Sequence, residues 1–271
     1  MVASREGPET CNSYNMLRLT QLLHRLDPQP RYADFYERTL YNHILSTQHP
    51  GHGGLVYFTP VRPRHYRVYS QAQECFWCCV GSGIENHGRH GAFAYTRGRE
   101  GLAVNLYMAS RLHGRERWLQ LEQETGFPGQ PRSVLRLRLD EPQAFALDLR
   151  HPHWLDGPMR VKVNGTPWPL SSTPASWARI ERRWSDGDTV EVELPMRTRI
   201  ENLPDGSDWV AVMHGPLVLA ARTGTEDLAG LVADSGRGSH IAPGPYQPLD
   251  RAPMLVGERD ALAAGIVPVA G

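Results

Sequence analysis

The sequence has no excess of charge of either sign, because its 29 lysine and arginine residues balance 29 aspartate and glutamate residues. No basic stripe therefore suggests a nucleic-acid partner. The chain also lacks an apolar run close to the roughly 18 to 20 residues that cross a bilayer, so we expect no membrane partner. Its start, Met1 to Pro8, is polar and lacks the apolar core of a signal peptide. We expect a soluble chain, and the sequence leaves its compartment open.

The sequence is also poor in cysteine, with four residues in 271. They are Cys11, Cys75, Cys78 and Cys79. Adjacent cysteines form a poor disulfide, because neighbouring Cα atoms lie about 3.8 Å apart and bridged cysteines usually need roughly 4.4 to 6.8 Å. We therefore expect Cys78 and Cys79 to be free thiols.

Three thiolates and one carboxylate suit zinc, which binds four N, S or O ligands in a tetrahedron. The strings Glu9-Thr10-Cys11 and Cys78-Cys79 could supply that set as Glu9, Cys11, Cys78 and Cys79. The spacing is not that of a zinc finger or ribbon, which would pair two C-x-x-C motifs. From spacing alone, a zinc site and a group of buried, inert thiols are equally good interpretations.

The first part of the chain has a helical pattern. Apolar residues recur every three or four positions from Cys11 until Pro28, and a second helix is expected from Pro30 to about Thr47. A stretch rich in Gly, Pro and His follows from His49 to Ser70, with a short strand expected at Leu55 to Phe58. A third helix is expected from Val80 to about Gly91.

Beyond Gly101 the apolar period changes to two, which predicts strands. The expected strands are Leu102 to Met108, Trp118 to Glu124, Val134 to Leu139, Phe145 to Leu149, Met159 to Val163, Trp177 to Glu181, Thr189 to Leu194 and Trp209 to Met213. Asn164-Gly165 predicts a hairpin turn, because both residues tolerate positive φ. The pattern is typical of an antiparallel β-sandwich. The predicted fold is α+β and multidomain: residues 1–98 helical, 99–222 a β-sandwich, and 223–271 a tail or the start of a further β region.

Three strings resemble a known enzyme family. They are Glu9-Thr10-Cys11-Asn12-Ser13-Tyr14-Asn15-Met16-Leu17, Tyr36-Glu37-Arg38-Thr39-Leu40-Tyr41-Asn42-His43-Ile44-Leu45 and Phe76-Trp77-Cys78-Cys79-Val80-Gly81. Together they resemble the zinc-dependent β-L-arabinofuranosidases of glycoside hydrolase families 127 and 146, and their residues are more similar to those of family 146. The later strings Trp184 to Asp188 and His214 to Leu219 are similar to the sandwich domain of that group.

The resemblance implies a fold and a set of site residues. It implies the C-terminal part of an (α/α)6 barrel followed by β-sandwich domains. It also implies one zinc ion held by Glu9, Cys11, Cys78 and Cys79, with Cys78 as the nucleophile of a retaining glycosidase. By the same resemblance, Glu37 and Tyr57 contact the sugar, and the substrate is an arabinose-containing glycan or glycoconjugate.

The resemblance also points to parts that this sequence does not contain. In the family the acid/base glutamate lies upstream of the E-x-C string, beyond the eight residues that precede Glu9 here. Three helices also cannot close an (α/α) barrel. We therefore expect a fragment that binds zinc and hydrolyses arabinosides poorly, with a missing N-terminal barrel half or a homo-oligomeric partner completing it.

Several alternatives remain open at this stage. Cys75 is expected to be a spectator thiol, because zinc needs four ligands. Glu74 and Glu85 flank the cysteine pair and could act as substitute acids. Histidines near the strings are expected to be structural or to contact sugar: His43, His49, His52, His65, His87 and His90. Three function classes follow: a zinc and cysteine-dependent arabinofuranosidase, a non-catalytic fragment stapled by zinc, and a carbohydrate-binding β-sandwich.

Overall fold

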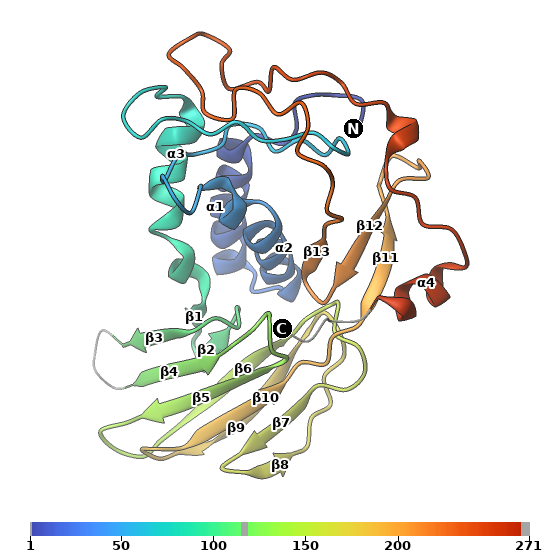
Figure 1. Cartoon of the computed structure of the whole chain (residues 1–271). Helices are drawn as coiled ribbons and strands as arrows, with labels where there is room; N and C mark the ends of the chain where they lie inside the picture. Colours follow the sequence, from blue (N-terminus) through green and yellow to red (C-terminus); the bar gives the residue numbers. More distant parts are fainter. Residues whose placement is uncertain (1, 115–118, 267–271) are drawn as a thin grey trace. The chain divides into compact units, whose positions relative to one another are not determined.

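The structure is a computed structural model that describes residues 2–114 and 119–266 (Figure 1). Its contacts divide the chain into two compact units. Unit 1 comprises Met1–Leu19, Arg38–Arg89 and Thr198–Gly271, and unit 2 comprises Thr20–Glu37 and His90–Arg197. Among the described residues, no helix combines the length and the apolar character that a membrane crossing needs. The predicted domain boundaries stay predictions.

Three helices lie close to the predicted ranges, whereas the fourth, α4, lies in the C-terminal region, where no helix was predicted. The helices are α1 (Thr10–Leu26), α2 (Pro30–Asn42), α3 (Cys78–His87) and α4 (Arg259–Gly265), with 3-10 turns η1 (Ile44–Thr47), η2 (His90–Phe93) and η3 (Leu249–Arg251). Pro28 marks the end of α1, and Pro30 occupies the first position of α2, where a missing N–H is harmless. The predicted second helix ends earlier than expected, at Asn42, and continues only as η1.

The expected strand at Leu55 to Phe58 is wrong. These residues make single bridges to three different segments, Gln48 with Leu55, Val56 with Tyr69, and Glu9 with Phe58. A strand needs a ladder along one neighbour, and here each pairing ends after one residue. The segment instead joins three parts of unit 1 to one another.

Unit 1 contains one small sheet, formed by the C-terminal region. Its strands are β11 (Thr198–Asn202), β12 (Val210–His214) and β13 (Leu217–Leu219), which pair antiparallel in the order β11-β12-β13. Helix α4 packs on β11. The predicted strand at Trp209 to Met213 is confirmed as β12, while β11 and β13 were not predicted.

Unit 2 contains two sheets. The strands are β1 (Tyr95–Arg97), β2 (Gly101–Val104), β3 (Ser110–His113), β4 (Gln120–Thr125), β5 (Arg132–Arg138), β6 (Gln143–His151), β7 (Arg160–Val163), β8 (Thr166–Trp168), β9 (Ser176–Trp184) and β10 (Thr189–Glu193). One sheet has the order β1-β2-β6-β9 and the other β3-β4-β5-β10-β7-β8. The chain is therefore α+β, with a short helical part followed by β-sheet domains.

The strand predictions hold in type and differ in detail. Asn164 (φ 51°) and Gly165 (φ 77°) form the predicted hairpin turn between β7 and β8. The pair β2 and β6 is parallel, whereas a wholly antiparallel arrangement was expected. Alternate residues of β5 and β10 are buried, as a period of two requires. Trp118, the expected start of one strand, lies outside the described residues.

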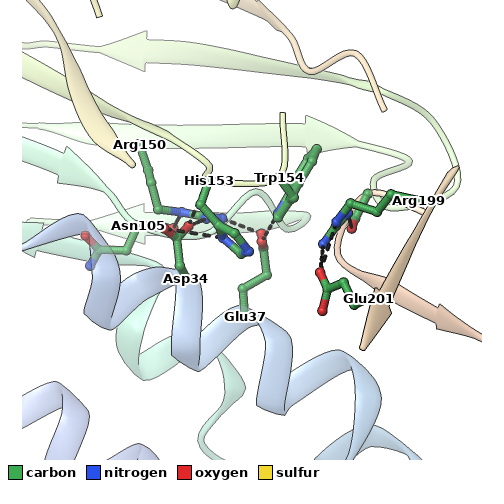
Figure 2. A network of polar contacts seen from close by, with 9 residues as sticks. Asp34, Glu37, Asn105, Arg150, His153, Trp154, Arg199 and Glu201 are labelled. Atoms are coloured by element: carbon green, nitrogen blue, oxygen red, sulfur yellow. Dashed lines mark hydrogen bonds and ion pairs between the residues drawn. The ribbon is translucent and has the colours of Figure 1, made fainter. Parts of the chain in front are cut away.

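A buried ion network ties α2 to β6 within unit 2 (Figure 2). Arg150 is fully buried and donates to Asp34 Oδ1 (2.5 Å), to Glu37 Oε1 and to the Asn105 carbonyl (2.6 Å). The indole N–H of Trp154 donates to the other oxygen of Glu37 at 2.7 Å. Because Asp34 and Glu37 are three residues apart on one helical face, both reach the same guanidinium.

The charges of this network stabilise one another. Burial opposes the ionisation of Asp34, but the hydrogen bond from His153 and the charge of Arg150 outweigh it and lower the pKa of Asp34. Burial likewise opposes the charge of Arg150, and Glu37 and Asp34 raise its pKa above the ordinary value. Asp34 and Arg150 are therefore charged at neutral pH, and each stabilises the charge of the other.

Candidate metal centre

Three of the predicted ligands lie at the N-terminal ends of two helices in unit 1. Cys11 is the second residue of α1, and Cys78 and Cys79 are the first two residues of α3. The N-terminal end of a helix has a partial positive charge, which favours a thiolate over a thiol. The fold thus brings together sulfur atoms that are 67 and 68 positions apart in sequence.

The separations of the sulfur atoms fit a single tetrahedral zinc ion. A Zn–S bond of about 2.3 Å and tetrahedral angles give sulfur–sulfur separations of roughly 3.8 Å. Sγ of Cys78 lies 3.5 Å from Sγ of Cys11 and 3.9 Å from Sγ of Cys79. All three sulfurs lie within 4.8 Å of one another. Among the described residues, these three form the one group of three or more potential metal ligands.

Glu9 contacts this cluster through Cys11. The Cys11 thiol donates to Oε2 of Glu9 at 3.5 Å. A thiolate and a carboxylate on one tetrahedral zinc would be separated by roughly 3.6 Å, given a Zn–O bond of about 2.1 Å. The Glu9 carboxylate is therefore at a suitable distance from one sulfur, but it is not among the ligand atoms that all lie within 4.8 Å of one another. The three sulfurs fit a zinc ion, and Glu9 as the fourth ligand stays a prediction.

Without a bound cation, burial favours the protonated form of two of these thiols. It raises the pKa of Cys11 to about 11, and it raises the pKa of Cys79 further above the ordinary thiol value. The backbone N–H of Cys11 donates to Sγ of Cys79 at 3.3 Å and opposes this rise. A bound divalent cation would reverse the balance, because coordination removes the thiol proton.

The anchoring of α1 and α3 to one segment explains why the thiols meet. The Thr10 hydroxyl donates to the Val56 carbonyl at 2.6 Å, which fixes the start of α1. Helix α3 approaches the same segment at Gly83, where an added Cβ would lie 2.7 Å from Cδ1 of Leu55. Glycine at position 83 therefore permits the close contact that places Cys78 and Cys79 beside Cys11.

Tyr57 extends from the same segment toward the cluster. A hydrogen bond with Cys78 is the largest of the effects that raise the pKa of the Tyr57 phenol far above its usual range. The phenol therefore keeps its proton and can donate it to a thiolate. The predicted site residue Tyr57 thus lies beside the predicted nucleophile.

Three family models match the chain in succession. The catalytic domain of GH127 β-L-arabinofuranosidases matches residues 2–92, and the middle domain of the same enzymes matches residues 101–196. A domain of unknown function, DUF4986, matches residues 199–271. The chain belongs to the GH127 β-L-arabinofuranosidase family.

Solved structures of glycoside hydrolases are similar to this GH127 chain. One named "Glycoside hydrolase" is 26% identical, with a TM-score of 0.69, over 78% of this chain and 37% of its own. Ara127N-Se, a GH127 β-L-arabinofuranosidase from Geobacillus stearothermophilus T6, is 27% identical with a TM-score of 0.66. The GH127 β-arabinofuranosidase BT3674 has the same identity and TM-score. This chain spans 36% of the length of each of the last two, and they match 78% of it. No curated protein matches this chain.

Two other residues of this GH127 chain, Cys75 and Glu37, make contacts of their own outside the three-sulfur group. The Cys75 thiol donates to the Asp234 carbonyl at 2.7 Å and is not part of the three-sulfur group. Glu37 is buried in the ion network of unit 2 with Arg150 and Trp154. Its predicted sugar contact stays a prediction, and the structure adds a structural role for it.

A second link joins α1 and α3. The Tyr14 hydroxyl donates to Oε2 of Glu85, and Arg18 forms an ion pair with the same oxygen at 3.5 Å. Glu85 thus holds the two helices together, whereas its sequence position beside the cysteines suggested a substitute acid. This contact of Glu85 could have been predicted from the sequence, because Tyr14 and Arg18 lie on the same face of α1 as Cys11.

The histidines of unit 1 make protein contacts. His43 is buried, and its Nδ1 lies 2.8 Å from the Ser13 hydroxyl. His49 and His52 stack at 3.8 Å between ring centroids, and the Nδ1 atom of each accepts a backbone N–H. Nε2 of His87 lies 3.5 Å from the Thr47 hydroxyl. These contacts favour structural roles.

Acid is expected to destabilise the protein through His43. Burial, with a smaller effect of Arg67, lowers its pKa from 6.5 to about 4. Between these values the unfolded chain binds a proton that the folded chain does not, so stability falls as pH falls from about 6.5 to 4 and is independent of this group above that window. The loss is about 3 kcal/mol at most. Urea unfolding of the His43→Asn variant at pH 7, 5 and 4, in chelator, should show a shallower pH dependence than wild type. Equal slopes would contradict this assignment.

Proposed function

We propose that this chain supplies the nucleophile and the metal ligands of a retaining β-L-arabinofuranosidase acting on arabinose-containing glycans. One observation carries the proposal: three sulfurs lie within 4.8 Å of one another, and one of them, that of Cys78, belongs to an exposed residue. Cys79 is buried and Cys11 is half-buried, so Cys78 is the thiol that a substrate can reach. Membership of the GH127 family supports the substrate class.

The chemistry needs one strong nucleophile and one acid. The Cys78 thiolate attacks the anomeric carbon, a C–S bond forms, and the C–O bond to the leaving group breaks with its electron pair on oxygen. The acid protonates that oxygen and becomes a base. This base then takes a proton from water as the water attacks the same carbon, the C–S bond breaks with its electron pair on sulfur, and the thiolate is restored. Zinc, when bound, keeps the sulfur deprotonated and stabilises it as a leaving group. Tyr57 orients the sulfur, and its phenol is also available to a sugar hydroxyl.

We further propose that the helical part belongs to a larger (α/α) barrel and that the two sheets of unit 2 form a β-sandwich. Exposed apolar residues on α1 support the barrel, because such a face normally packs against other helices. They are Met16, Leu19, Leu22, Leu23 and Leu26. The acid/base glutamate is proposed to lie in that further helical part.

A substrate that needs no acid tests the nucleophile directly. Dinitrophenolate leaves without protonation, so a dinitrophenyl β-L-arabinofuranoside should give a burst of one dinitrophenolate per zinc-loaded chain. Peptide mass spectrometry should then find one arabinosyl group on Cys78. Turnover of an ordinary aryl arabinofuranoside should stay poor.

Two matched variants complete this test. Cys78→Ala should abolish the burst and the adduct, whereas Cys75→Ala, which removes a nearby thiol outside the cluster, should keep both. A burst that persists in Cys78→Ala would contradict the proposal. A folded, zinc-loaded wild-type chain that never forms the adduct would instead favour a non-catalytic chain in which zinc has only a structural role.

A cavity in unit 2 favours a second candidate function, carbohydrate binding by the sheets. Its volume is about 1090 Å³, and Trp177, Arg179, Asp148 and Glu100 are among the residues that line it. Arg179 pairs with Asp148 (2.8 Å) and Glu100 (2.7 Å), and Trp177 lines the same cavity, so the cavity combines an aromatic side chain with polar groups as sugar sites do. Calorimetric titration with arabino-oligosaccharides should detect binding that Trp177→Ala removes. Binding unchanged by that substitution would exclude this cavity.

A further inference from the structure

Within unit 1, the C-terminal segment 229–247 contacts the loop between η1 and α3. This loop contains the aromatic residues Tyr57, Phe58 and Trp77. Figure 1 draws this segment in orange beside the cyan loop. Backbone bonds join Tyr69 N–H to the Leu231 carbonyl (2.9 Å) and Ala233 N–H to the Tyr69 carbonyl (2.8 Å). The Gln71 side-chain amide also donates to the Ala233 carbonyl, at 2.9 Å. The segment therefore pairs with the loop in a fixed register.

Side chains strengthen this attachment on both sides of the pairing. The Tyr66 hydroxyl donates to the Ala229 carbonyl (2.7 Å) and accepts the N–H of Gly244 (2.8 Å). Arg62 donates to the Gln247 carbonyl at 2.7 Å. A small core lies beneath, formed by Val68, Ala233 and Ala242, with Tyr66, Cys75 and Trp77 packed against it. The contact is thus both polar and apolar.

His240 is the residue of this segment that reaches the site. Its ring stacks on Tyr57 with centroids 4.3 Å apart and 29° between the planes. It also meets the edge of Trp77 at 5.3 Å and lies 5.7 Å from Phe58. Among the described residues its buried Nδ1 has no hydrogen-bond partner, so the ring acts here through stacking.

We propose that the C-terminal region, which matches a domain of unknown function, contributes to the thiolate site, and that His240 is a positioning residue for Tyr57. The inference deepens the proposed function and rests on it for the role of Cys78. The stacked imidazole holds the Tyr57 ring, whose hydroxyl interacts with Cys78. A hydrogen bond to a thiolate lowers its reactivity with small electrophiles and fixes its direction toward a sugar.

Two readouts that move in opposite directions test this role. In the zinc-loaded chain, His240→Ala should speed the alkylation of Cys78 by iodoacetamide about fivefold, since one hydrogen bond of ordinary strength corresponds to that factor. The dinitrophenolate burst should slow by a similar factor. Tyr57→Phe, which lacks the hydroxyl, sets the limit for alkylation. His240→Phe keeps the stacking and should restore both rates.

Controls separate this inference from the nucleophile itself. Arg237→Ala changes an exposed side chain of the same segment and should behave as wild type. If the wild-type chain forms no adduct while the alkylation rates follow the predicted order, the positioning role of His240 is supported and the nucleophile role of Cys78 is rejected. If the adduct forms and His240→Ala alkylates at the wild-type rate, the positioning role is overturned. A Tyr57→Phe chain that alkylates at the wild-type rate overturns it as well.

Discussion

Replacing Arg150 by methionine is expected to lower the free energy of unfolding by about 3–5 kcal/mol, because removal of one partner leaves buried charges uncompensated. Arg150 is fully buried, and its guanidinium contacts both Asp34 and Glu37. Methionine fills a similar volume, so the loss measures charge pairing more than packing. Urea unfolding followed by circular dichroism would give the difference.

Two further variants control this prediction. Arg179 also pairs with two carboxylates, but 48% of its side chain is exposed, so Arg179→Met should cost less than about 1 kcal/mol. Adding Glu37→Gln to Arg150→Met should recover part of the loss, because it removes one uncompensated charge. An Arg150→Met protein as stable as Arg179→Met would show that the buried network contributes nothing.

Zinc is expected to stabilise the fold by about 4 kcal/mol when its free concentration is a thousand times the dissociation constant. The ion would join α1 to α3 by binding Cys11 on one helix and Cys78 and Cys79 on the other. Thermal unfolding with and without a chelator measures this effect. The melting temperature of the wild-type chain should fall in chelator.

The Cys79→Ala variant should lose this response. Removing a direct ligand is expected to weaken zinc binding by more than the roughly 100-fold that loss of an outer partner costs. Cys75→Ala is the matched control and should respond to chelator as wild type does, because its thiol contacts Asp234 instead of the cluster. Equal responses in all three chains would place the metal elsewhere.

The sequence predicted α1, α2, α3 and most strands because their signals are local, but it did not predict α4. Pro28 and Pro30 bound two helices, and Asn164-Gly165 fixes one turn, each through its own backbone preferences. The expected strand at Leu55 to Phe58 failed because its neighbours are set by tertiary contacts. The parallel pairing of β2 with β6 also depends on the topology of the sheet, which a period of two does not encode.

The candidate site could be predicted where residue type alone was informative. Adjacent cysteines form a poor disulfide and suggest a metal site, and the structure brings Cys78 and Cys79 together with Cys11. Arg150 was not predicted, because its partner Asp34 lies 116 positions away. His240 was missed because it stands in a stretch rich in Gly, Ala and Pro with no periodicity.

Zinc K-edge X-ray absorption of the purified chain tests the central claim most directly, because it counts the atoms bound to the metal. The account predicts one zinc per chain with three sulfur ligands at about 2.3 Å and one oxygen ligand at about 2.1 Å. Cys78→Ala should reduce the sulfur count to two. A chain that retains no zinc, or a first shell without sulfur, would contradict the account.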